Sequence, residues 1–419
     1  MNIRLDNLCR SVVKTNPIGK PVVSLNNISV NLPDGSITGL IGPSFSGKSS
    51  LLFIIAGLFD ATSGSIYFGN TDVTKIPTEK RNVGFVFQDY QLYPHLNVLQ
   101  NIMFPLLARK ESKKVAKEKA MKIAETMGLT DILNKKPDSI LTHQRILVAI
   151  ARAYVKEPSI VLLDEPLSNL DVRYKNDTRD LIKKIQRETN ITTIFVSQNQ
   201  EDTIYVSDYL MLLNEGTVKA YGTPEDLYGN PENQFVAEFL GNPAINIIQC
   251  EYKEDEESIK KAEELSNENV ADTEEKIEDE LETNVDTEEE TESTPLVEAE
   301  EKKENIIEAE VPKGILSFGE QIFVDDKTPA FGERMILTKD TRLAVRPESF
   351  EFTPNGKYVM HVESFEFTGR ENLIRFTLPG IDETFNCLAP LELNVNPGMD
   401  IKFNFKRYFI FDTIGRRLK

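Results

Sequence analysis

The segment "GPSFSGKSS", residues 42–50, decides the fold of the first half of the chain. Its glycines, lysine and serine match the phosphate-loop pattern G-x-x-x-x-G-K-[ST], in which backbone N–H groups surround nucleotide phosphates. Lys48 adds a positive charge beside the β- and γ-phosphates, and Ser49 offers a hydroxyl to Mg²⁺. The pattern predicts that Mg-ATP is bound by the whole loop: Gly42, Pro43, Ser44, Phe45, Ser46, Gly47, Lys48, Ser49 and Ser50.

Strand-like and helix-like runs alternate around this loop. "GSITGLIG" (35–42) is typical of a buried strand, and "SSLLFIIAGL" (49–58) is typical of a buried helix. "SIVLLDEP" (159–166) and "TTIFVSQ" (192–198) are further buried strands. This alternation predicts an α/β fold with a mainly parallel sheet covered by helices. Ligands of such folds bind beyond the carboxyl ends of the strands.

The segment "IVLLDEPLSNLD", residues 160–171, supplies the carboxylates that such a site requires. Four apolar residues lead to Asp164 and Glu165 at a strand end. Asp164 is placed to hold the Mg²⁺ shell, and Glu165 is placed to polarise an attacking water. The long separation from Lys48 leaves room for an inserted helical subdomain at about residues 89–150, where "SKKVAKEKAMKIAETMGL" has helical periodicity.

Charge is distributed unevenly along the 419 residues, whose net charge is −19. Residues 251–310 contain 26 acidic and 6 basic residues, whereas the remainder contains 41 and 42. The acidic stretch has almost no aromatic residues and no sustained apolar face, so we expect a disordered insertion. The balanced remainder gives no electrostatic reason to expect nucleic-acid binding. Its three scattered cysteines have no metal or redox spacing, and no run is apolar and long enough for a transmembrane helix.

These motifs together resemble the ATP-hydrolysing subunit of a bacterial ABC importer of the kind that serves maltose, other oligosaccharides and glycerol phosphate. "RNVGFVFQDYQLYPHLNVLQNI" resembles the glutamine loop of that family, with Gln88 at the position that contacts the metal. "LAVRPESFEF" and "FIFDTIGRRL" resemble parts of its β-rich, OB-like regulatory domain. The resemblance implies an ATPase domain over residues 1–240 and a regulatory domain over 241–250 and 311–419, interrupted by the acidic insertion.

The resemblance also implies partners and a location. Ser49, Gln88 and Asp164 are expected to hold Mg²⁺, and Glu165 and Gln198 to act on ATP. Two ATPase subunits would close around two ATPs, each held by the phosphate loop of one subunit and the signature L-S-G-G-Q of the other. The pair would serve two integral-membrane permease subunits at the cytoplasmic face of the membrane, and a solute-binding protein indirectly.

Two motifs of this chain depart from the family pattern. The signature position holds Ile140, Leu141, Thr142, His143 and Gln144, of which only Gln144 matches. Thr142 offers a hydroxyl in place of the family serine, but both glycines are replaced as well. Gln198 stands where the family has a switch histidine, and its amide cannot titrate. These departures predict slow hydrolysis, and they favour pairing with an intact second subunit over a homodimer.

Aromatic residues are also distributed unusually. Family members stack adenine on an aromatic side chain in the first hairpin, but residues 1–44 contain no Phe, Tyr or Trp. Phe45 replaces a small residue in the phosphate loop. It is strained if its φ is positive, whereas the alternative is a ring that simply points outward.

Three functions are compatible with these patterns. The first is a working but slow ATPase subunit of a carbohydrate-type importer. The second is a structural or regulatory subunit that binds ATP without useful hydrolysis. The third, an ABC protein of translation or DNA repair, is disfavoured because the chain has one ATPase unit, an importer-like β domain and no basic patch.

Overall fold

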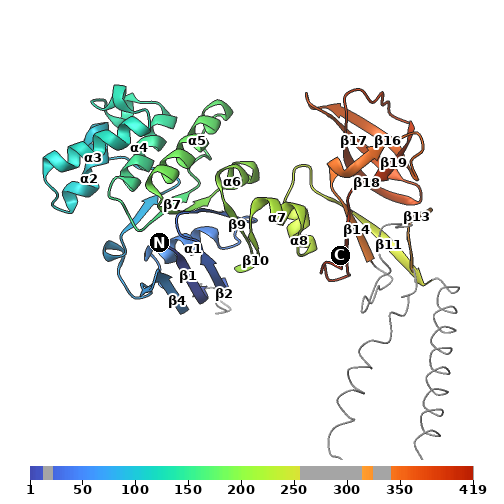
Figure 1. Ribbon diagram of the computed structural model, residues 1–419, viewed down its shortest axis with the longest axis horizontal. Coiled ribbons are helices and arrows are strands. Elements are labelled where there is room, and N and C mark those ends of the chain that lie inside the picture. Colours follow the sequence, from blue (N-terminus) through green and yellow to red (C-terminus); the bar gives the residue numbers. More distant parts are fainter. Residues whose placement is uncertain (13–21, 255–313, 324–340, 419) are drawn as a thin grey trace, which may run out of the picture. The chain divides into compact units, whose positions relative to one another are not determined.

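The computed structural model describes residues 1–12, 22–254, 314–323 and 341–418 (Figure 1). The chain divides into two compact units, unit 1 (Met1–Asn242) and unit 2 (Pro243–Lys419). From residue 255 onward, the predicted disordered insertion lies outside the described residues.

The main sheet of unit 1 has six strands in the order β10-β9-β3-β8-β7-β6. All neighbouring strands are parallel except β10, which pairs antiparallel with β9 at one edge. Every residue of β3, β7 and β8 is buried, as expected for strands covered on both faces. The strands are β3 (Ile37–Ile41), β6 (Val83–Val86), β7 (Ile160–Asp164), β8 (Thr192–Val196), β9 (Tyr209–Asn214) and β10 (Thr217–Gly222).

The register of this sheet brings the predicted site together. Leu40 of β3 pairs with Val196 of β8, and Val196 pairs with Asp164 of β7. Because these strands are parallel, the segments that follow them emerge at the same edge of the sheet. The phosphate loop, Glu165 and Gln198 therefore lie at neighbouring strand ends.

Helices and a small second sheet cover the main sheet and enclose three cores, the smallest of which joins β9 and β10 to α7 and α8 and includes Leu210 and Leu227. One core lies between the main sheet, α1 and the small sheet and includes Ile3, Leu51 and Ile160. Another joins the main sheet to α2–α5 and includes Ile102 and Ile146. The helices are α1 (Lys48–Ala56), α2 (Val98–Ala108), α3 (Lys113–Thr126), α4 (Thr142–Tyr154), α5 (Val172–Thr189), α6 (Gln200–Val206), α7 (Pro224–Gly229) and α8 (Gln234–Phe239).

The small sheet of unit 1 is antiparallel, with the order β2-β1-β4-β5. Its strands are β1 (Ile3–Val12), β2 (Val22–Leu32), β4 (Ser63–Phe68) and β5 (Thr71–Asp72). The expected helical subdomain corresponds to α2, α3 and α4, which lie between β6 and β7 in the chain. Within the described part of the chain, no helix has both the length and the apolar character needed to cross a membrane.

Unit 2 is β-rich and contains two five-stranded antiparallel sheets. The first has the order β13-β12-β11-β14-β20, and the second has the order β15-β19-β16-β17-β18. In the second sheet the outer strands β15 and β18 also contact each other, so the sheet curls into a partial barrel. The strands are β11 (Asn246–Glu254), β12 (Gly314–Phe318), β13 (Gln321–Phe323), β14 (Thr341–Val345), β15 (Phe350–Phe352), β16 (Tyr358–Phe367), β17 (Asn372–Leu378), β18 (Ile381–Ala389), β19 (Asp400–Phe405) and β20 (Phe409–Phe411).

Strand β11 extends beyond the boundary expected from the sequence. Residues 251–254, assigned to the start of the disordered insertion, continue β11 and pair antiparallel with β12. The acidic segment thus lies between the two strands of one pair, because the partner strand begins again at Gly314. Composition alone did not locate this boundary, since backbone pairing tolerates the charged residues at the end of the strand.

Asn246, the first residue of β11, joins both sheets of unit 2. Its side-chain amide donates to the carbonyl oxygens of Val345 (3.0 Å) and Asn386 (2.8 Å). Its side-chain oxygen accepts the backbone N–H of Asn386 at 2.8 Å. The residue is 5% exposed, so little water is available to replace these bonds.

We expect Asn246→Ala to lower the free energy of unfolding of unit 2 by about 2–4 kcal/mol, because it leaves buried backbone groups unpaired. Asn386→Ala is the matched control: Asn386 contributes only backbone atoms to this network, so its substitution should cost less than about 1 kcal/mol. Thermal unfolding of the full chain measures both. Equal losses for the two variants would contradict this role of Asn246.

Candidate functional site

The phosphate loop connects β3 to α1 and is shaped by two glycines with positive φ. Gly42 has φ 151° and Gly47 has φ 106°. A side chain at Gly42 would lie 2.0 Å from the carbonyl oxygen of Leu213, and one at Gly47 would lie 2.6 Å from that of Ser24. Both positions therefore require glycine for steric reasons.

Lys48 folds back over this loop. Its ammonium group donates to the carbonyl oxygens of Gly42 and Pro43, each at 2.8 Å, and lies 3.5 Å from Oγ of buried Ser46. Burial lowers the pKa of Lys48, while the charges of Glu165 and Asp164 oppose that shift. The ammonium group is thus held inside the loop, beside the place where phosphates bind.

Phe45 combines the two possibilities considered from the sequence. Its φ is 66°, and its side chain is 104% exposed. A left-handed conformation costs a residue with a side chain about 1–2 kcal/mol, and the exposed ring recovers none of that cost within the chain. Ser44 is also exposed, so the outer turn of the loop projects into solvent.

Asp164 provides the buried carboxylate of the site. The side chain is 6% exposed, and one of its oxygens, Oδ1, has no hydrogen-bond partner among the described residues. Burial raises the pKa of Asp164, while a hydrogen bond from the Ser49 side chain and the charge of Lys48 oppose this effect. A hydroxyl next to a carboxylate with an unpaired buried oxygen is an oxygen-donor set that suits Mg²⁺, so Ser49 and Asp164 fit the metal.

Glu165 and Gln198 lie side by side at the ends of β7 and β8. The backbone N–H of Gln198 donates to the Glu165 carboxylate at 3.2 Å. Glu165 is buried, and its own φ is 50°. Burial raises the pKa of Glu165, and the Gln198 hydrogen bond opposes that change. The Gln198 side chain itself is exposed.

Gln88 is exposed just beyond β6, the edge strand next to β7. Two strands, β8 and β7, separate β6 from β3, so Gln88 is the most distant of the predicted site residues in the sheet order. Residues 13–21, which belong to the stretch 1–44 without an aromatic side chain for adenine stacking, lie outside the described residues.

The segment at the signature position begins helix α4. The side-chain oxygen of Gln144 accepts the backbone N–H of Leu141 at 3.1 Å, so the one matching residue caps its own helix. The His143 ring stacks on Tyr174 of α5, with centroids 4.0 Å apart and planes 8° apart. Burial lowers the pKa of His143, partly offset by the charge of Asp177. The imidazole is thus held against the neighbouring helix, in surroundings that favour its neutral form.

Arg81 is a supporting residue that sequence reasoning missed. It is 5% exposed and donates to the carbonyl oxygens of Ile54 (2.7 Å) and Ile55 (3.0 Å) at the end of α1, and also to those of Thr74 and Ile76. It therefore fixes the carboxyl end of the helix whose amino end carries Lys48. Neither the residue type nor the spacing in the sequence indicates this contact.

A phosphate loop and two carboxylates at adjacent ends of a parallel sheet, with helices inserted between the strands, define a nucleotide-binding α/β domain. Residues 25–168 match the family model "ABC transporter", so unit 1 has the fold of an ABC-type ATPase domain. CbiO1 of Clostridium perfringens, part of the ABC transporter complex CbiONQ, has this fold as well. It is 24% identical with a TM-score of 0.50, covering 54% of this chain and 90% of that chain.

Curated relatives are similar over the same part of the chain. The trehalose/maltose import ATP-binding protein MalK of Thermococcus litoralis is 38% identical over 240 residues, 56% of this chain and 64% of the relative. The sn-glycerol-3-phosphate import protein UgpC of Jannaschia sp. is 39% identical over 54% of this chain and 65% of the relative. The spermidine/putrescine import protein PotA of Mesoplasma florum is 40% identical over 54% and 64%. The chain thus spans a little under two thirds of the length of these relatives.

We expect Lys48→Ala to weaken Mg-ATP binding by about 10- to 100-fold, since a hydrogen bond to a charged group contributes about 1.5–3 kcal/mol. Calorimetric titration of the full chain measures the affinity. Lys75→Ala removes an exposed lysine away from the loop and is the matched control. Equal affinities of wild type and Lys48→Ala would show that nucleotide does not occupy this loop.

We expect Phe45→Gly to raise the free energy of unfolding of unit 1 by about 0.5–1 kcal/mol, because glycine adopts positive φ without strain. Phe45→Ala keeps the Cβ and hence the strain, so it should leave stability nearly unchanged. Urea unfolding of the three proteins measures the difference. A lower stability of Phe45→Gly than of Phe45→Ala would show that the positive φ does not strain this position.

Proposed function

We propose that this chain is the ATP-binding subunit of an ABC importer, coupling ATP binding and hydrolysis to solute uptake. The observation that carries this proposal is the convergence of Lys48, Asp164, Glu165 and Gln198 at one edge of the main sheet. The matched family and the printed names of the relatives supply the transport context.

Each residue of the site has a physical task in this proposal. Backbone N–H groups of residues 42–47 and the ammonium group of Lys48 bind the phosphates of ATP. Ser49 and Asp164 hold Mg²⁺, with Gln88 completing the set from the segment that follows β6. Bound Mg²⁺ would neutralise charge on the phosphates. Glu165, kept close to Gln198 by a hydrogen bond, orients the attacking water.

Hydrolysis is slow in this proposal because groups aimed at the γ-phosphate are missing or engaged elsewhere. Gln144 caps its own helix, and His143 stacks on Tyr174. Neither provides the close backbone approach that glycine allows. Gln198 offers an amide where the family has an imidazole. The same observations favour the second candidate function, a subunit that binds ATP and regulates or completes an importer without useful hydrolysis.

A second ABC ATPase subunit is the proposed immediate partner, with an intact heterologous subunit favoured over a second copy. Among the described residues of unit 1, the three most exposed large apolar side chains are Phe45 (104%), Val172 (77%) and Leu141 (58%). They belong to the phosphate loop, to the start of α5 and to the signature position. Exposed apolar groups beside the nucleotide motifs support an association surface there.

The remaining partners follow from the transport context. We propose that two integral-membrane permease subunits dock on the ATPase pair at the cytoplasmic face of the membrane, with a solute-binding protein acting indirectly. Oligosaccharides or glycerol phosphate are the proposed solutes. Relatives of similar identity carry the names of polyamine and sulfate importers, so the solute needs a direct test. Purifying the native complex, identifying its subunits and measuring which solute stimulates its ATPase provides that test.

We expect the chain alone to hydrolyse ATP poorly and a mixed dimer with an intact partner to be faster. A missing donor at the transferring phosphoryl group costs about 10²–10³ in rate, and the partner's signature restores one set of donors. Gln198→His should raise turnover of the mixed dimer and do little in the homodimer. Four ATPase assays decide: homodimer and mixed dimer, each with and without Gln198→His.

The partner's own site must be silenced by mutation in both mixed samples so that only this chain's site is measured. Glu165→Gln in the mixed dimer is the control that should abolish the remaining rate. Brisk hydrolysis by the unmodified homodimer would contradict the slow-hydrolysis proposal. No hydrolysis in any sample, with ATP still bound, would favour the regulatory subunit.

A further inference from the structure

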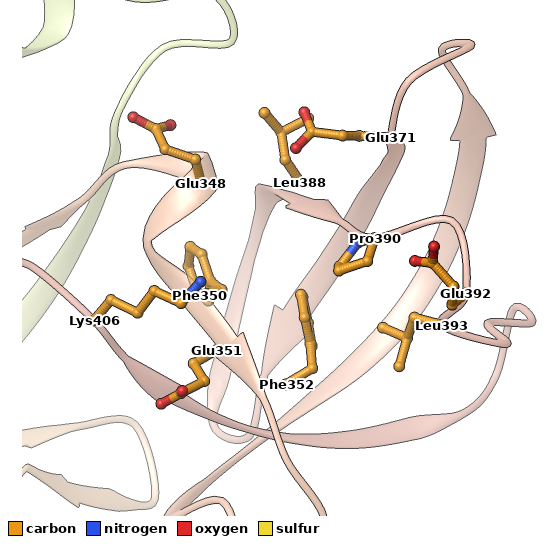
Figure 2. A pocket seen from close by; sticks show the side chains of 10 residues that line it. All are labelled: Glu348, Phe350, Glu351, Phe352, Glu371, Leu388, Pro390, Glu392, Leu393 and Lys406. Carbon is orange, nitrogen blue, oxygen red and sulfur yellow. The ribbon is translucent and has the colours of Figure 1, made fainter.

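Unit 2 contains a pocket of about 440 Å³ beside β15 and the loop after β18 (Figure 2). Its floor is apolar, because Phe350 packs there on the aromatic core of the unit. Its charged side chains are all exposed, and they are Glu348, Glu351, Glu371, Glu392 and Lys406. Exposed charges are ordinary at a protein surface, so no ligand follows from this lining.

Buried charged side chains are more informative, because they need partners. Within the described part of unit 1, five are buried: Lys48, Arg81, Asp164, Glu165 and Asp202. The first, third and fourth of these form the nucleotide site, and Arg81 supports α1. Asp202 of α6 is the most buried of the five, at 3% exposed, and its task is not explained by either of these structures.

Helix α5 lies beside α6 (Figure 1) and supplies two cations to the carboxylate of Asp202. Nη1 of Arg179 lies 3.1 Å from Oδ1, and Nζ of Lys175 lies 3.7 Å from Oδ2. The Arg179 side chain is 16% exposed and also packs over the ring of Tyr205, 4.7 Å from its centroid. Removal of one partner from a buried ion pair is costly, because the other charge remains buried.

The first turn of α6 connects Asp202 to Gln198. The side-chain oxygen of Asn199 accepts the backbone N–H of Asp202 at 2.9 Å. The backbone N–H of Asn199 in turn donates to Oγ of Ser197 at 3.1 Å. Gln198 lies between Ser197 and Asn199 in the chain, so the direction of its own N–H depends on where this turn is anchored.

We propose that Arg179 and Lys175 are positioning residues for the nucleotide site. By fixing Asp202 they hold the first turn of α6, so that the N–H of Gln198 stays on the Glu165 carboxylate. Arg179 makes the shorter contact and contributes more of this effect. The contact is a feature of the fold, and only its effect on turnover rests on the proposed function.

Hydrogen exchange of the nucleotide-free full chain tests this contact without an ATPase assay. Arg179→Met should speed amide exchange of residues 196–200 about tenfold or more, because a hydrogen bond to a charged group shifts an equilibrium by about 10- to 100-fold. Arg179→Lys keeps a cation and should restore most of the protection. Lys183→Met is the matched control, since Lys183 joins the same helices at the other end of α6, through the carbonyl oxygen of Tyr205 at 2.9 Å. It should leave exchange of residues 196–200 unchanged.

Asp202→Asn tests whether Arg179 acts through Asp202. This variant should also speed exchange of residues 196–200. Addition of Arg179→Met to it should then change exchange little, because the effects of residues in direct contact are not additive. Thermal unfolding of each variant confirms that unit 1 is folded.

Turnover is the second measurement, made in the mixed dimer whose partner site has been silenced. Arg179→Met should lower kcat about tenfold, because a small misplacement of a group that orients the attacking water costs rate. KM for ATP and the calorimetric affinity for Mg-ATP should stay unchanged, since the phosphate loop and Lys48 are untouched. Arg179→Lys should retain most of kcat.

Wild-type exchange of residues 196–200 in Arg179→Met, or additive effects in the double variant, would overturn the positioning role. Equal losses of kcat and of Mg-ATP affinity would overturn it too, because Arg179 would then only support the fold. The exchange result decides the positioning of Gln198 even where the wild-type mixed dimer does not hydrolyse ATP. Failure of the proposed function is thereby distinguished from failure of this inference.

Discussion

The alignment of three buried parallel strands is the constraint on which the nucleotide site depends. Leu40, Val196 and Asp164 lie in one row across β3, β8 and β7. These strands are buried on both faces, so a shift of one residue would move the side chains of both faces at once. The row therefore fixes the phosphate loop, Glu165 and Gln198 relative to one another. Arg81 adds a further restraint on the phosphate loop, because it donates hydrogen bonds to carbonyl oxygens at the carboxyl end of α1.

That alignment places three ionisable groups where water is scarce. Burial lowers the pKa of Lys48 and raises the pKa values of Asp164 and Glu165, while the opposite charges of the lysine and the carboxylates limit each shift. The hydrogen bond from Ser49 and the backbone N–H of Gln198 further stabilise the ionised carboxylates. In the proposed function, a ligand that carries phosphates and a divalent cation would interact strongly with these charges, because charge interactions are stronger away from bulk water.

Buried strands that correspond to a local run of apolar residues could be predicted from the sequence. The apolar run before Gly42 and the run before Asp164 predicted buried strands, and those strands are β3 and β7. Contacts between distant residues were not predictable in the same way. The His143–Tyr174 stack joins residues of two helices, and the four bonds of Arg81 depend on how α1 packs. The end of β11 was misplaced because its pairing partner begins about sixty residues later in the sequence.

In the proposed function, the residues at and near the signature position that would support association with a partner differ from those that would act on ATP. The side-chain oxygen of Gln144 and the ring of His143 make contacts within the chain, so in the proposed function these two groups add little to a phosphate held by a neighbouring subunit. Leu141 and Val172, at the starts of the same two helices, remain largely exposed and apolar. Burial of such side chains stabilises a contact at about 25 cal/mol per Å² without any hydrogen bond to nucleotide. In the proposed function, pairing of this chain with another subunit and cleavage of ATP would therefore depend on different residues, and a change that weakens cleavage could leave pairing intact.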